Sequence, residues 1–348
     1  MQVSVITTVA NGKEALPVPI GIPEKVDGVV VRYYRRWTGD HTHLSPALMA
    51  QLWRTVRQYD VVHIHSWWNL VAIPGALICW LKGVRPFFSP RGMLSPYGRE
   101  QSKFVAKALF HRLLGRRLLM QTILHATSIQ EAQEALLLLP DWPFFVAPNL
   151  IDLPAGVSAS YPVPEPSLLR LVFLSRLHPK KGLDLLFPAL ATLDFHWHLE
   201  LIGAGEPAYE AELKALATSL GISDRLHWLG WLEGDTKFDK LAQADLLVLP
   251  SRNENFANVV LESLAVGTPV LLTDQVGMSE YVAEKGLGWV CAVSTEGLKV
   301  TLKKAYLQID EYRTQRTQIA RSVSDDFAPK QIALQYLAAY EKFCHAPG

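Results

Sequence analysis

Short apolar runs alternate along the chain with longer stretches in which apolar residues recur at helical spacing. Continuous apolar runs are typical of strands buried on both faces, and recurrence every three or four positions is typical of helices with one buried face. Alternation of the two predicts α/β domains built on parallel sheets. The predicted strands are residues 3–8, 29–33, 61–65, 87–89 and 122–126 in the first half, and 169–174, 198–202, 226–229 and 246–249 in the second.

Three stretches have the pattern of amphipathic helices. Residues 46–59 follow Ser45, and residues 129–138 follow Ser128, so we expect each serine to cap the helix that it precedes. The third stretch is the tail of the chain, residues 329–348, which carries the apolar spacing of a helix.

The chain is long enough, at 348 residues, for two domains of ordinary size. Prolines concentrate in the stretch PAGVSASYPVPEP, a composition that is typical of a linker. The expected organisation is a first domain over residues 1–152, a linker over 153–167, a second domain over 168–328 and a C-terminal helix over 329–348.

Composition narrows the class of protein. A formal net charge of +1 gives no support to nucleic-acid binding. The three cysteines are scattered and odd in number, which favours a reduced compartment over a disulfide framework or a metal cluster. No signal peptide is visible, and the longest uncharged apolar-rich stretch, residues 65–82, is shorter than the about 20 apolar residues that span a bilayer. We therefore expect a cytoplasmic protein.

The segment over residues 250–273, PSRNENFANVVLESLAVGTPVLLT, holds two glutamates. Glu254 falls in a polar loop after a predicted strand, and Glu262 falls about two turns into the helix predicted to follow. A helix start offers N–H groups and a positive dipole end to a diphosphate, and carboxylates accept hydrogen bonds from sugar and ribose hydroxyls. The combination fits a nucleotide sugar, and an ordinary βα unit with surface glutamates is the alternative.

Asn255, Phe256 and the sequence GTPV at residues 267–270 lie in register with this glutamate pair. With them the segment resembles the donor site of retaining GT-B glycosyltransferases. These belong to the large family (glycosyltransferase family four, group-one type) that builds bacterial surface polysaccharides, lipopolysaccharide and glycolipids. The resemblance implies an α/β protein of two Rossmann-like domains, whose parallel sheets face an interdomain crevice. It also implies transfer of a hexosyl group from a nucleoside-diphosphate sugar to a hydroxyl, with retention at the anomeric carbon.

The resemblance assigns roles to residues of the second half. Arg176 and Lys181, in FLSRLHPKKGLDLL, match positions that grip the donor diphosphate, whose growing negative charge needs fixed cations. Glu254 would hold hydroxyls of the donor sugar, and Glu262 would hold the ribose. Further donor-binding positions implied by the resemblance are Asn255, Phe256, Ala257, the Gly203 and Gly205 turn and, in the first half, Gly12.

The sequence contains no Asp-x-Asp triplet, which glycosyltransferases of the other main fold use to hold a divalent metal. Because Arg176 and Lys181 are present instead, we expect charge neutralisation without a metal, and no cofactor. Trp231 lies where the family usually lines the base pocket, and a place in the core is equally open.

The first half carries candidates for the acceptor side. Asn11 and Gly12 follow the opening strand, where relatives often have a glycine pair near the transferring phosphate and the acceptor. His65, two residues after His63, either lines the acceptor cleft or is a buried structural histidine. Arg91, in SPRGMLSP, stands where many relatives have a histidine near the donor sugar. Arginine keeps its charge, so the resemblance gives Arg91 an electrostatic or positioning role and no proton transfer.

Two further segments are interpreted through the resemblance. Asn149 and Asp152, in VAPNLIDL, match a hinge motif with a structural role. The terminal helix of GT-B enzymes commonly crosses back onto the first domain, and packing on the second domain alone is the alternative.

Residues 99–117, REQSKFVAKALFHRLLGRR, combine a helical apolar stripe with six Lys or Arg and one acid. This helix would either lie on an anionic membrane or turn its apolar face into the core. Relatives use lipid-linked acceptors at the inner face of the cytoplasmic membrane, so the resemblance favours peripheral association there.

The predicted function is therefore a metal-independent, retaining hexosyltransferase, with UDP favoured over GDP from family frequency. Its acceptor would be a cell-surface polysaccharide, a lipopolysaccharide or a lipid-linked saccharide. Two alternatives remain open, namely a nucleotide-sugar epimerase of the same fold and a non-catalytic, sugar-binding member.

Overall fold

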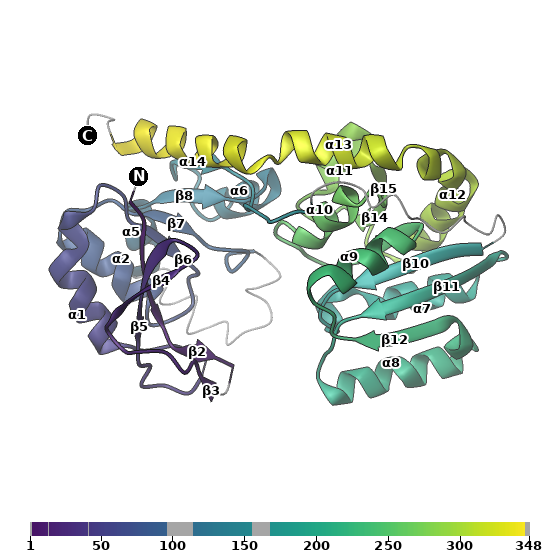
Figure 1. The fold of residues 1–348 in the computed structure, drawn as a ribbon, viewed down its shortest axis with the longest axis horizontal. Helices are drawn as coiled ribbons and strands as arrows, with labels where there is room; N and C mark the ends of the chain where they lie inside the picture. The colour runs from purple at the N-terminus through teal and green to yellow at the C-terminus, as the bar shows by residue number, and fades with distance from the viewer. Residues whose placement is uncertain (1, 13, 41, 96–113, 155–167, 345–348) are drawn as a thin grey trace. The chain divides into compact units, whose positions relative to one another are not determined.

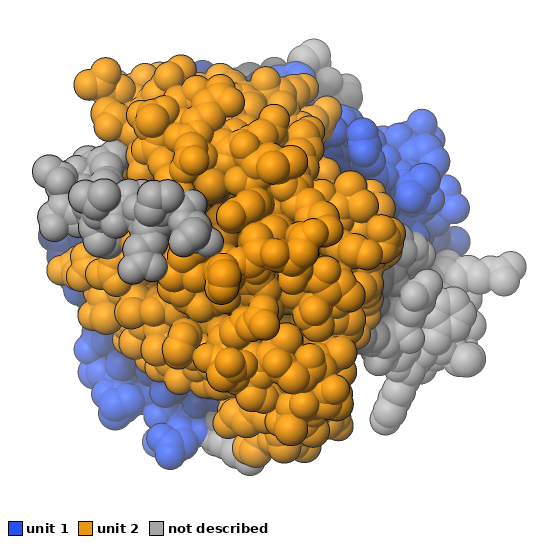
Figure 2. Space-filling view, turned by 90° about the vertical axis from the view of Figure 1, so that its right-hand side faces the viewer, with its two compact units in different colours: residues 1–147, 336–348 blue, residues 148–335 orange. Residues whose placement is uncertain are grey.

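The computed structural model describes residues 2–12, 14–40, 42–95, 114–154 and 168–344. The chain divides into two compact units, coloured blue and orange in Figure 2. Unit 1 comprises residues 1–147 and 336–348, and unit 2 comprises residues 148–335. Each unit encloses hydrophobic core clusters of its own.

Unit 1 contains a four-stranded sheet with parallel pairings, a three-stranded sheet and a two-stranded hairpin (Figure 1). In the three-stranded sheet the central strand pairs parallel with one neighbour and antiparallel with the other. The three-stranded sheet is β1 (Ser4–Thr8), β5 (Val29–Tyr34) and β4 (Pro23–Val26), the hairpin is β2 (Ala10–Asn11) and β3 (Glu14–Ala15), and the four-stranded sheet is β6 (His63–His65), β7 (Phe87–Ser89), β8 (Ile123–Ala126) and β9 (Phe144–Val146).

Two helices of unit 1 begin at Pro46 and Ile129, where the apolar pattern predicts them. Ser128 caps its helix as expected, because its Oγ accepts a hydrogen bond from the Glu131 N–H at 3.1 Å. The expected side-chain cap at Ser45 is wrong, since this buried hydroxyl donates to the Arg35 carbonyl at 2.7 Å instead. The helices are α1 (Pro46–Thr55), continued by the 3₁₀ turn η1 (Val56–Gln58), α2 (Ala72–Leu81), α5 (Arg116–Met120) and α6 (Ile129–Leu136).

Unit 2 is built on one six-stranded sheet in the order β12-β11-β10-β13-β14-β15, in which every pairing is parallel. The chain leaves β10 toward one edge of the sheet, and from β13 onward it proceeds toward the other edge. The loops after β10 and β13 therefore lie side by side at a topological switch point, where α/β sheets bind ligands. The strands are β10 (Leu168–Leu174), β11 (His196–Ile202), β12 (Leu226–Gly230), β13 (Leu246–Leu249), β14 (Val270–Thr273) and β15 (Gly288–Cys291).

Helices cover both faces of this sheet (Figure 1), which explains why every residue of β13 and β14 is buried. Helix α7 packs against α8 and α12, and α10 packs against α9 and α13. The helices are α7 (Leu183–Ala191), α8 (Pro207–Ser219), α9 (Gly234–Gln243), α10 (Asn258–Ala265), α11 (Ser279–Lys285), α12 (Thr295–Thr314) and α13 (Arg316–Asp326), with 3₁₀ turns η3 (Pro179–Lys181) and η4 (Ser223–Arg225).

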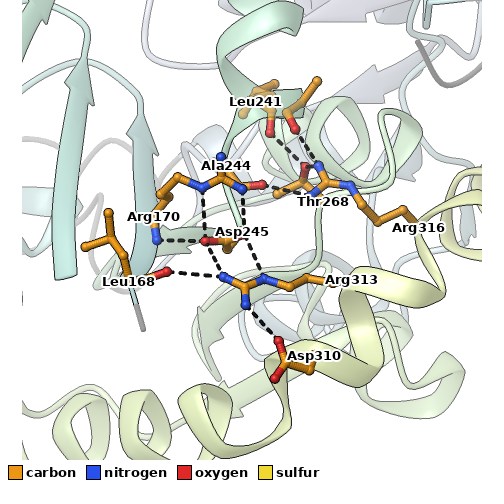
Figure 3. Close-up of polar contacts among 10 residues, drawn as sticks. Leu168, Arg170, Leu241, Ala244, Asp245, Thr268, Asp310, Arg313 and Arg316 are labelled. Carbon is orange, nitrogen blue, oxygen red and sulfur yellow. Dashed lines mark hydrogen bonds and ion pairs between the residues drawn. The ribbon is translucent and has the colours of Figure 1, made fainter. Parts of the chain in front are cut away.

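A buried carboxylate ties the C-terminal helices to the start of β13 (Figure 3). Asp245 lies between Arg170 and Arg313, and its two oxygens accept hydrogen bonds from both guanidinium groups at 2.9–3.2 Å. Burial alone raises the pKa of Asp245, but the hydrogen bonds from the two arginines outweigh it and hold that pKa below its ordinary value. Arg316 adds bonds to the carbonyls of Ala244 and Ala242. The network anchors α12 and α13 to the sheet at the amino-terminal ends of its strands.

Helix α14 (Pro329–Cys344) contributes its first residues to unit 2, and its residues from Tyr336 onward group with unit 1. There Tyr340 and Phe343 contact Phe87 and Phe145 edge-to-face or tilted, with ring centroids 4.7–6.5 Å apart. Such aromatic contacts stabilise the packing of this part of α14 on the four-stranded sheet.

Two predicted segments lie largely outside the described residues. Of the predicted linker over 153–167, the structure describes only residues 153 and 154, and of the basic segment 99–117 it describes residues 114–117. Among the described residues, no helix combines the length and apolar character needed to cross a membrane.

Candidate functional site

The loops after β10 and β13 carry two cations, Arg176 and Lys181, and one carboxylate, Glu254, that the sequence singled out. Lys181 ends the 3₁₀ turn η3, and its Nζ donates a hydrogen bond to Oε1 of Glu254. The two side chains are only 13% and 16% exposed. The switch-point topology thus brings a residue predicted to bind the diphosphate next to a residue predicted to bind the sugar. The two come from opposite halves of the sheet.

A second ion pair fixes these two loops to each other. The Arg252 guanidinium binds both carboxylate oxygens of Asp184 at 2.8 Å, and its backbone N–H donates to the Lys180 carbonyl at 2.8 Å. A bidentate pair of this kind fixes orientation as well as distance. Sequence reasoning missed this pair, because 68 positions separate its two members and each lies in a different segment.

Gly182 is required at the point where the two loops touch. Its φ is +72°, and a Cβ added there would stand 2.0 Å from the carbonyl oxygen of Pro250. Any other residue would push the loop that carries Lys181 away from the loop that carries Glu254. Gly182 therefore sets the separation between these two side chains.

The backbone of Glu254 is also held by the loop after β14. Its N–H donates to the Gln275 carbonyl at 2.9 Å, and its own carbonyl accepts from the Gly277 N–H at 2.9 Å. These two bonds form an isolated parallel bridge between Glu254 and Val276. The carboxylate therefore projects from a backbone that is anchored on two sides.

The start of α10 lies directly after this loop. Ala257 occupies the N-cap with φ +65° and no side-chain cap, and the first amides of a helix have no partner within it. Such an uncapped helix start suits an anion. Phe256 is buried beside Phe327, so its side chain packs in the core and only its backbone faces the helix start. Asn255, between Glu254 and Phe256, is partly exposed.

Glu262 lies closer to the helix start than the sequence predicted. It stands four residues, or just over one turn, after Asn258, where two turns were expected. Its Oε1 accepts a hydrogen bond from Nζ of Lys237 on α9 at 2.9 Å. Lys237 was not among the predicted site residues, because it lies 25 positions upstream on another helix.

Positive charge accumulates around the loop after β10. Arg176 is exposed there, and His178 lies between it and the two lysines. The pKa of His178 is lowered, first by partial desolvation and then by the charges of Arg176, Lys180 and Lys181. Sequence reasoning missed His178. This concentration of cations favours an anionic ligand.

Gly203 and Gly205 have a packing role that explains both glycines. A Cβ on Gly203 would stand 1.9 Å from the Ser175 carbonyl oxygen, and one on Gly205 would stand 2.2 Å from that of Leu177. The turn therefore presses against the loop that carries Arg176. Of the two interpretations of Trp231, a place in the core is wrong, since the residue is 60% exposed and its Nε1 donates to Glu233 at 2.7 Å.

The GTPV sequence lies at the amino-terminal ends of the strands, whereas Glu254 lies at their carboxyl ends. Gly267 has φ +80°, and its added Cβ would stand 2.6 Å from the Arg316 carbonyl oxygen. The Thr268 hydroxyl donates to the Leu241 carbonyl at 2.7 Å (Figure 3). These residues precede β14 and hold α10 and α13 together. They therefore support the segment over residues 250–273 structurally, but they do not lie at the carboxyl ends of the strands, where a ligand would bind.

In unit 1, β6, β7 and β8 bring together a chain of hydrogen bonds. It runs from Tyr340 through His63, Ser89 and His125 to the Ala147 carbonyl, with distances of 2.8, 2.7, 2.6 and 2.9 Å. The carbonyl can only accept, so His125 donates from Nε2. With both imidazoles neutral, each earlier group donates to the next, and Tyr340 donates to Nδ1 of His63.

Burial explains why these histidines stay neutral. Desolvation lowers the pKa of His63 to about 2, with smaller contributions from His65, His125 and Arg91. The pKa of His125 falls to about 4, again first through burial. His65 stacks on His63 with ring centroids 4.5 Å apart. Its side chain is exposed at the surface, although desolvation lowers its pKa to about 4, so the alternative of a fully buried histidine does not describe it.

Arg91 lies beside this histidine cluster. Its φ is +53°, and the next residue, Gly92, donates its N–H to Oε1 of the buried Glu131 at 2.8 Å. The other oxygen of Glu131 accepts from the N–H and hydroxyl of Thr127 at 2.7 and 2.9 Å. Glu131 thus fixes the turn that presents Arg91, a link that no sequence motif predicted.

The remaining predicted positions have simpler surroundings. Gly12 follows β2 with φ +57°, its carbonyl accepts from Arg36 at 2.8 Å, and Asn11 is exposed. Asn149 donates to Oδ1 of Asn258, the first residue of α10, at 2.9 Å, and Asp152 is exposed. Asn149 therefore contacts α10 inside unit 2.

Two family models match the chain in succession. The first, described as "Glycosyl transferase 4-like domain", matches residues 1–149, and the second, "Glycosyl transferases group 1", matches residues 165–323. Both models describe glycosyl transferases, and together they match well over half of the chain. The chain belongs to the glycosyltransferases. The second match contains β10 to β14 with the loops around Lys181, Glu254 and Glu262.

Curated relatives of this glycosyltransferase align with parts of it. A D-inositol 3-phosphate glycosyltransferase from Jonesia denitrificans is 30% identical over 180 residues, 49% of this chain and 42% of the relative. The lipopolysaccharide core biosynthesis glycosyltransferase LpsE from Rhizobium meliloti is 38% identical over 116 residues, 33% of each chain. The glycosyltransferase described here therefore aligns with less than half the length of these relatives.

Solved structures match the glycosyltransferase over almost its whole length. Sucrose-phosphate synthase from Thermosynechococcus elongatus gives a TM-score of 0.73 at 16% identity, covering 99% of this chain and 100% of that one. Anabaena Alr3699/HepE, solved in complex with UDP and glucose, gives 0.70 at 18% identity, covering 98% and 100%. At these identities the match establishes the fold, which is GT-B.

Proposed function

We propose that this protein transfers a hexosyl group from a nucleoside-diphosphate sugar to an acceptor hydroxyl. The observation that carries the proposal is the convergence of Lys181, Glu254 and the uncapped start of α10 at the switch point of unit 2. An ammonium and a helix start suit a diphosphate, and a carboxylate suits sugar hydroxyls. Few ligands other than nucleotide sugars combine these groups.

In this proposal the departure of the diphosphate is assisted by fixed charge. Lys181, Arg176 and the first amides of α10 stabilise the negative charge that develops on the leaving group. Glu254 orients the sugar through its hydroxyls, and Glu262 binds the ribose. Because these cations already belong to the protein, we propose that no metal is needed.

We further propose that the configuration at the anomeric carbon is retained without a covalent enzyme intermediate, as family resemblance suggests. Arg91 would contribute its fixed charge from unit 1, where Glu131 holds its turn in place. His65, exposed beside His63, is proposed for the acceptor side together with Asn11.

UDP is the proposed nucleotide, supported by the HepE complex with UDP and glucose among the structural relatives. A lipopolysaccharide or lipid-linked saccharide is the proposed acceptor, supported by the alignment with a lipopolysaccharide core glycosyltransferase. An acceptor of this kind fits peripheral association with an anionic membrane through residues 99–117.

A thermal-shift panel of UDP-, GDP- and ADP-sugars in the presence of EDTA, followed by donor hydrolysis on any hit, tests the proposal. UDP-sugars are expected to raise the melting temperature of the wild type but not of Glu262→Ala, and hydrolysis is expected to continue in EDTA. Hydrolysis that EDTA stops and magnesium restores would remove metal independence. Absence of any shift would favour a non-catalytic member of the fold.

A further inference from the structure

Helix α9 presents two lysines to two carboxylates on different elements. Lys237 Nζ lies 2.9 Å from Glu262 Oε1 on α10, and Lys240 Nζ lies 2.7 Å from Glu200 Oε1 on β11. The first pair is mostly buried, with side chains 20% and 14% exposed. The second is slightly more open, at 28% and 22%. The pairs have the same chemistry, but only the first involves a residue of the donor segment.

The ammonium of Lys237 is held from two directions. It donates to Glu262 and also stands over the ring of Phe238, 4.6 Å from the ring centroid. A cation over an aromatic face is stabilised by the ring quadrupole. Since α9 and α10 pack against each other, the position of Lys237 relative to Glu262 is set by the fold.

This contact restricts what Glu262 can do. A glutamate side chain has three rotatable bonds, and an unrestrained carboxylate loses entropy when it binds a ligand. With Oε1 committed to Lys237, the carboxylate plane is fixed and Oε2 retains its capacity to accept hydrogen bonds. A hydrogen bond that a hydroxyl donates to a carboxylate is also stronger than one that it donates to a neutral oxygen.

We propose that Lys237 is a positioning residue that orients Glu262 for recognition of the ribose hydroxyls of the donor nucleotide. The inference rests on the proposed function, in which Glu262 binds the ribose. Lys237 acts through Glu262 and makes ribose recognition depend on an interaction between α9 and α10.

The test compares binding of UDP with that of 2′,3′-dideoxy-UDP, measured by isothermal titration calorimetry. Wild type should bind UDP about tenfold or more tightly than the dideoxy nucleotide, as expected for hydrogen bonds to a charged group. Lys237→Met and Lys237→Gln should lose most of this preference by weakening UDP alone, and Lys237→Arg should retain it. Lys240→Met is the matched control and should bind both nucleotides as the wild type does.

The outcomes distinguish a failure of the inference about Lys237 from a failure of the proposed function. If Glu262→Gln loses the preference while Lys237→Met and Lys237→Gln keep it, the role of Lys237 is disproved and the donor site stands. If wild type shows no preference, or binds neither nucleotide, both the ribose role of Glu262 and the inference are disproved. An equal loss in Lys240→Met would show a general effect of α9 and would also overturn the inference.

Discussion

Lys181 and Glu254 are hydrogen-bonded to each other although 73 positions separate them in the sequence. The pair joins the two loops that flank the switch point of the unit 2 sheet. A sugar diphosphate at this point would offer phosphate oxygens to the lysine and hydroxyls to the glutamate. Each side chain would then exchange its present partner for a group of the ligand.

Glu254→Gln should reduce transfer much more than donor binding. The amide keeps the shape of the carboxylate but loses its charge, so the sugar is held less firmly in the transition state. We expect kcat to fall by a factor of about 100 or more, while KM for the donor changes little. Steady-state kinetics measures this, with Glu284→Gln on α11 as a control outside the site. A donor KM that rises in proportion to the loss in kcat/KM, with kcat unchanged, would contradict it.

Gly182→Ala should destabilise unit 2 and weaken donor binding together. The new Cβ meets a carbonyl oxygen at 2.0 Å in a left-handed backbone, so the two loops must separate. Gly221→Ala is the matched control, because Gly221 has φ +68° and an added Cβ there meets nothing within 4 Å. The control should lose only the roughly 1–2 kcal/mol of left-handed strain. Urea unfolding and nucleotide titration check this, and equal losses in both variants would refute the clash.

Asp245→Ala should destabilise the protein without changing nucleotide affinity. The substitution leaves Arg170 and Arg313 without their buried carboxylate, which costs about 3–5 kcal/mol. The network lies at the amino-terminal ends of the strands, away from Glu254, so the nucleotide affinity of the folded protein should persist. Urea unfolding and calorimetry at low temperature separate the two effects. Asp194→Ala, which removes an exposed partner of Lys303, should cost far less.

Mild acid should destabilise unit 1 through its neutral histidines. His63 has its pKa lowered to about 2 and His125 to about 4, both first by burial. The unfolded chain binds protons near pH 6.5 and the folded chain does not, so stability is full above that pH and declines as pH falls toward the folded pKa values. Each histidine contributes a slope of up to ~1.4 kcal/mol per pH unit.

Urea midpoints of the wild type between pH 7 and pH 5 measure this decline. His63→Gln should be less stable at pH 7 but should show a shallower decline, because one buried imidazole is gone. His196→Gln, which changes an exposed histidine of unit 2, should follow the wild-type profile. A pH-independent midpoint in the wild type would rule out neutral buried imidazoles as the cause.

Arg91→Ala should cut turnover sharply while the fold survives. The residue contributes a fixed charge next to the histidine cluster, and its turn is held by the hydrogen bond from the Gly92 N–H to Glu131. Arg57→Ala, which removes an exposed arginine bonded to the Lys82 carbonyl, is the control. Melting temperature and donor hydrolysis together check this prediction, and a near-normal rate would remove Arg91 from the site.

The apolar pattern of the sequence alone predicts the fold class and many of the strands. Uniform apolar runs become strands such as β10 and β13 because parallel strands are buried on both faces, and this requirement is local. The same holds for the cap at Ser128, which depends on residues within one turn. The strands β14 and β15, of four residues each, were not predicted from the sequence.

Tertiary structure decided which residues of a motif face a ligand. Glu254 and GTPV belong to one segment, yet they lie at opposite ends of the strands. The reason is that α10 runs back between them, from the carboxyl end of β13 to the amino end of β14. Ser45 has the right residue type for a cap, but its hydroxyl finds the Arg35 carbonyl in the fold. The partners of the site residues, Lys237 and Arg252 among them, come from elements distant in sequence, because ion pairs depend on distance in space.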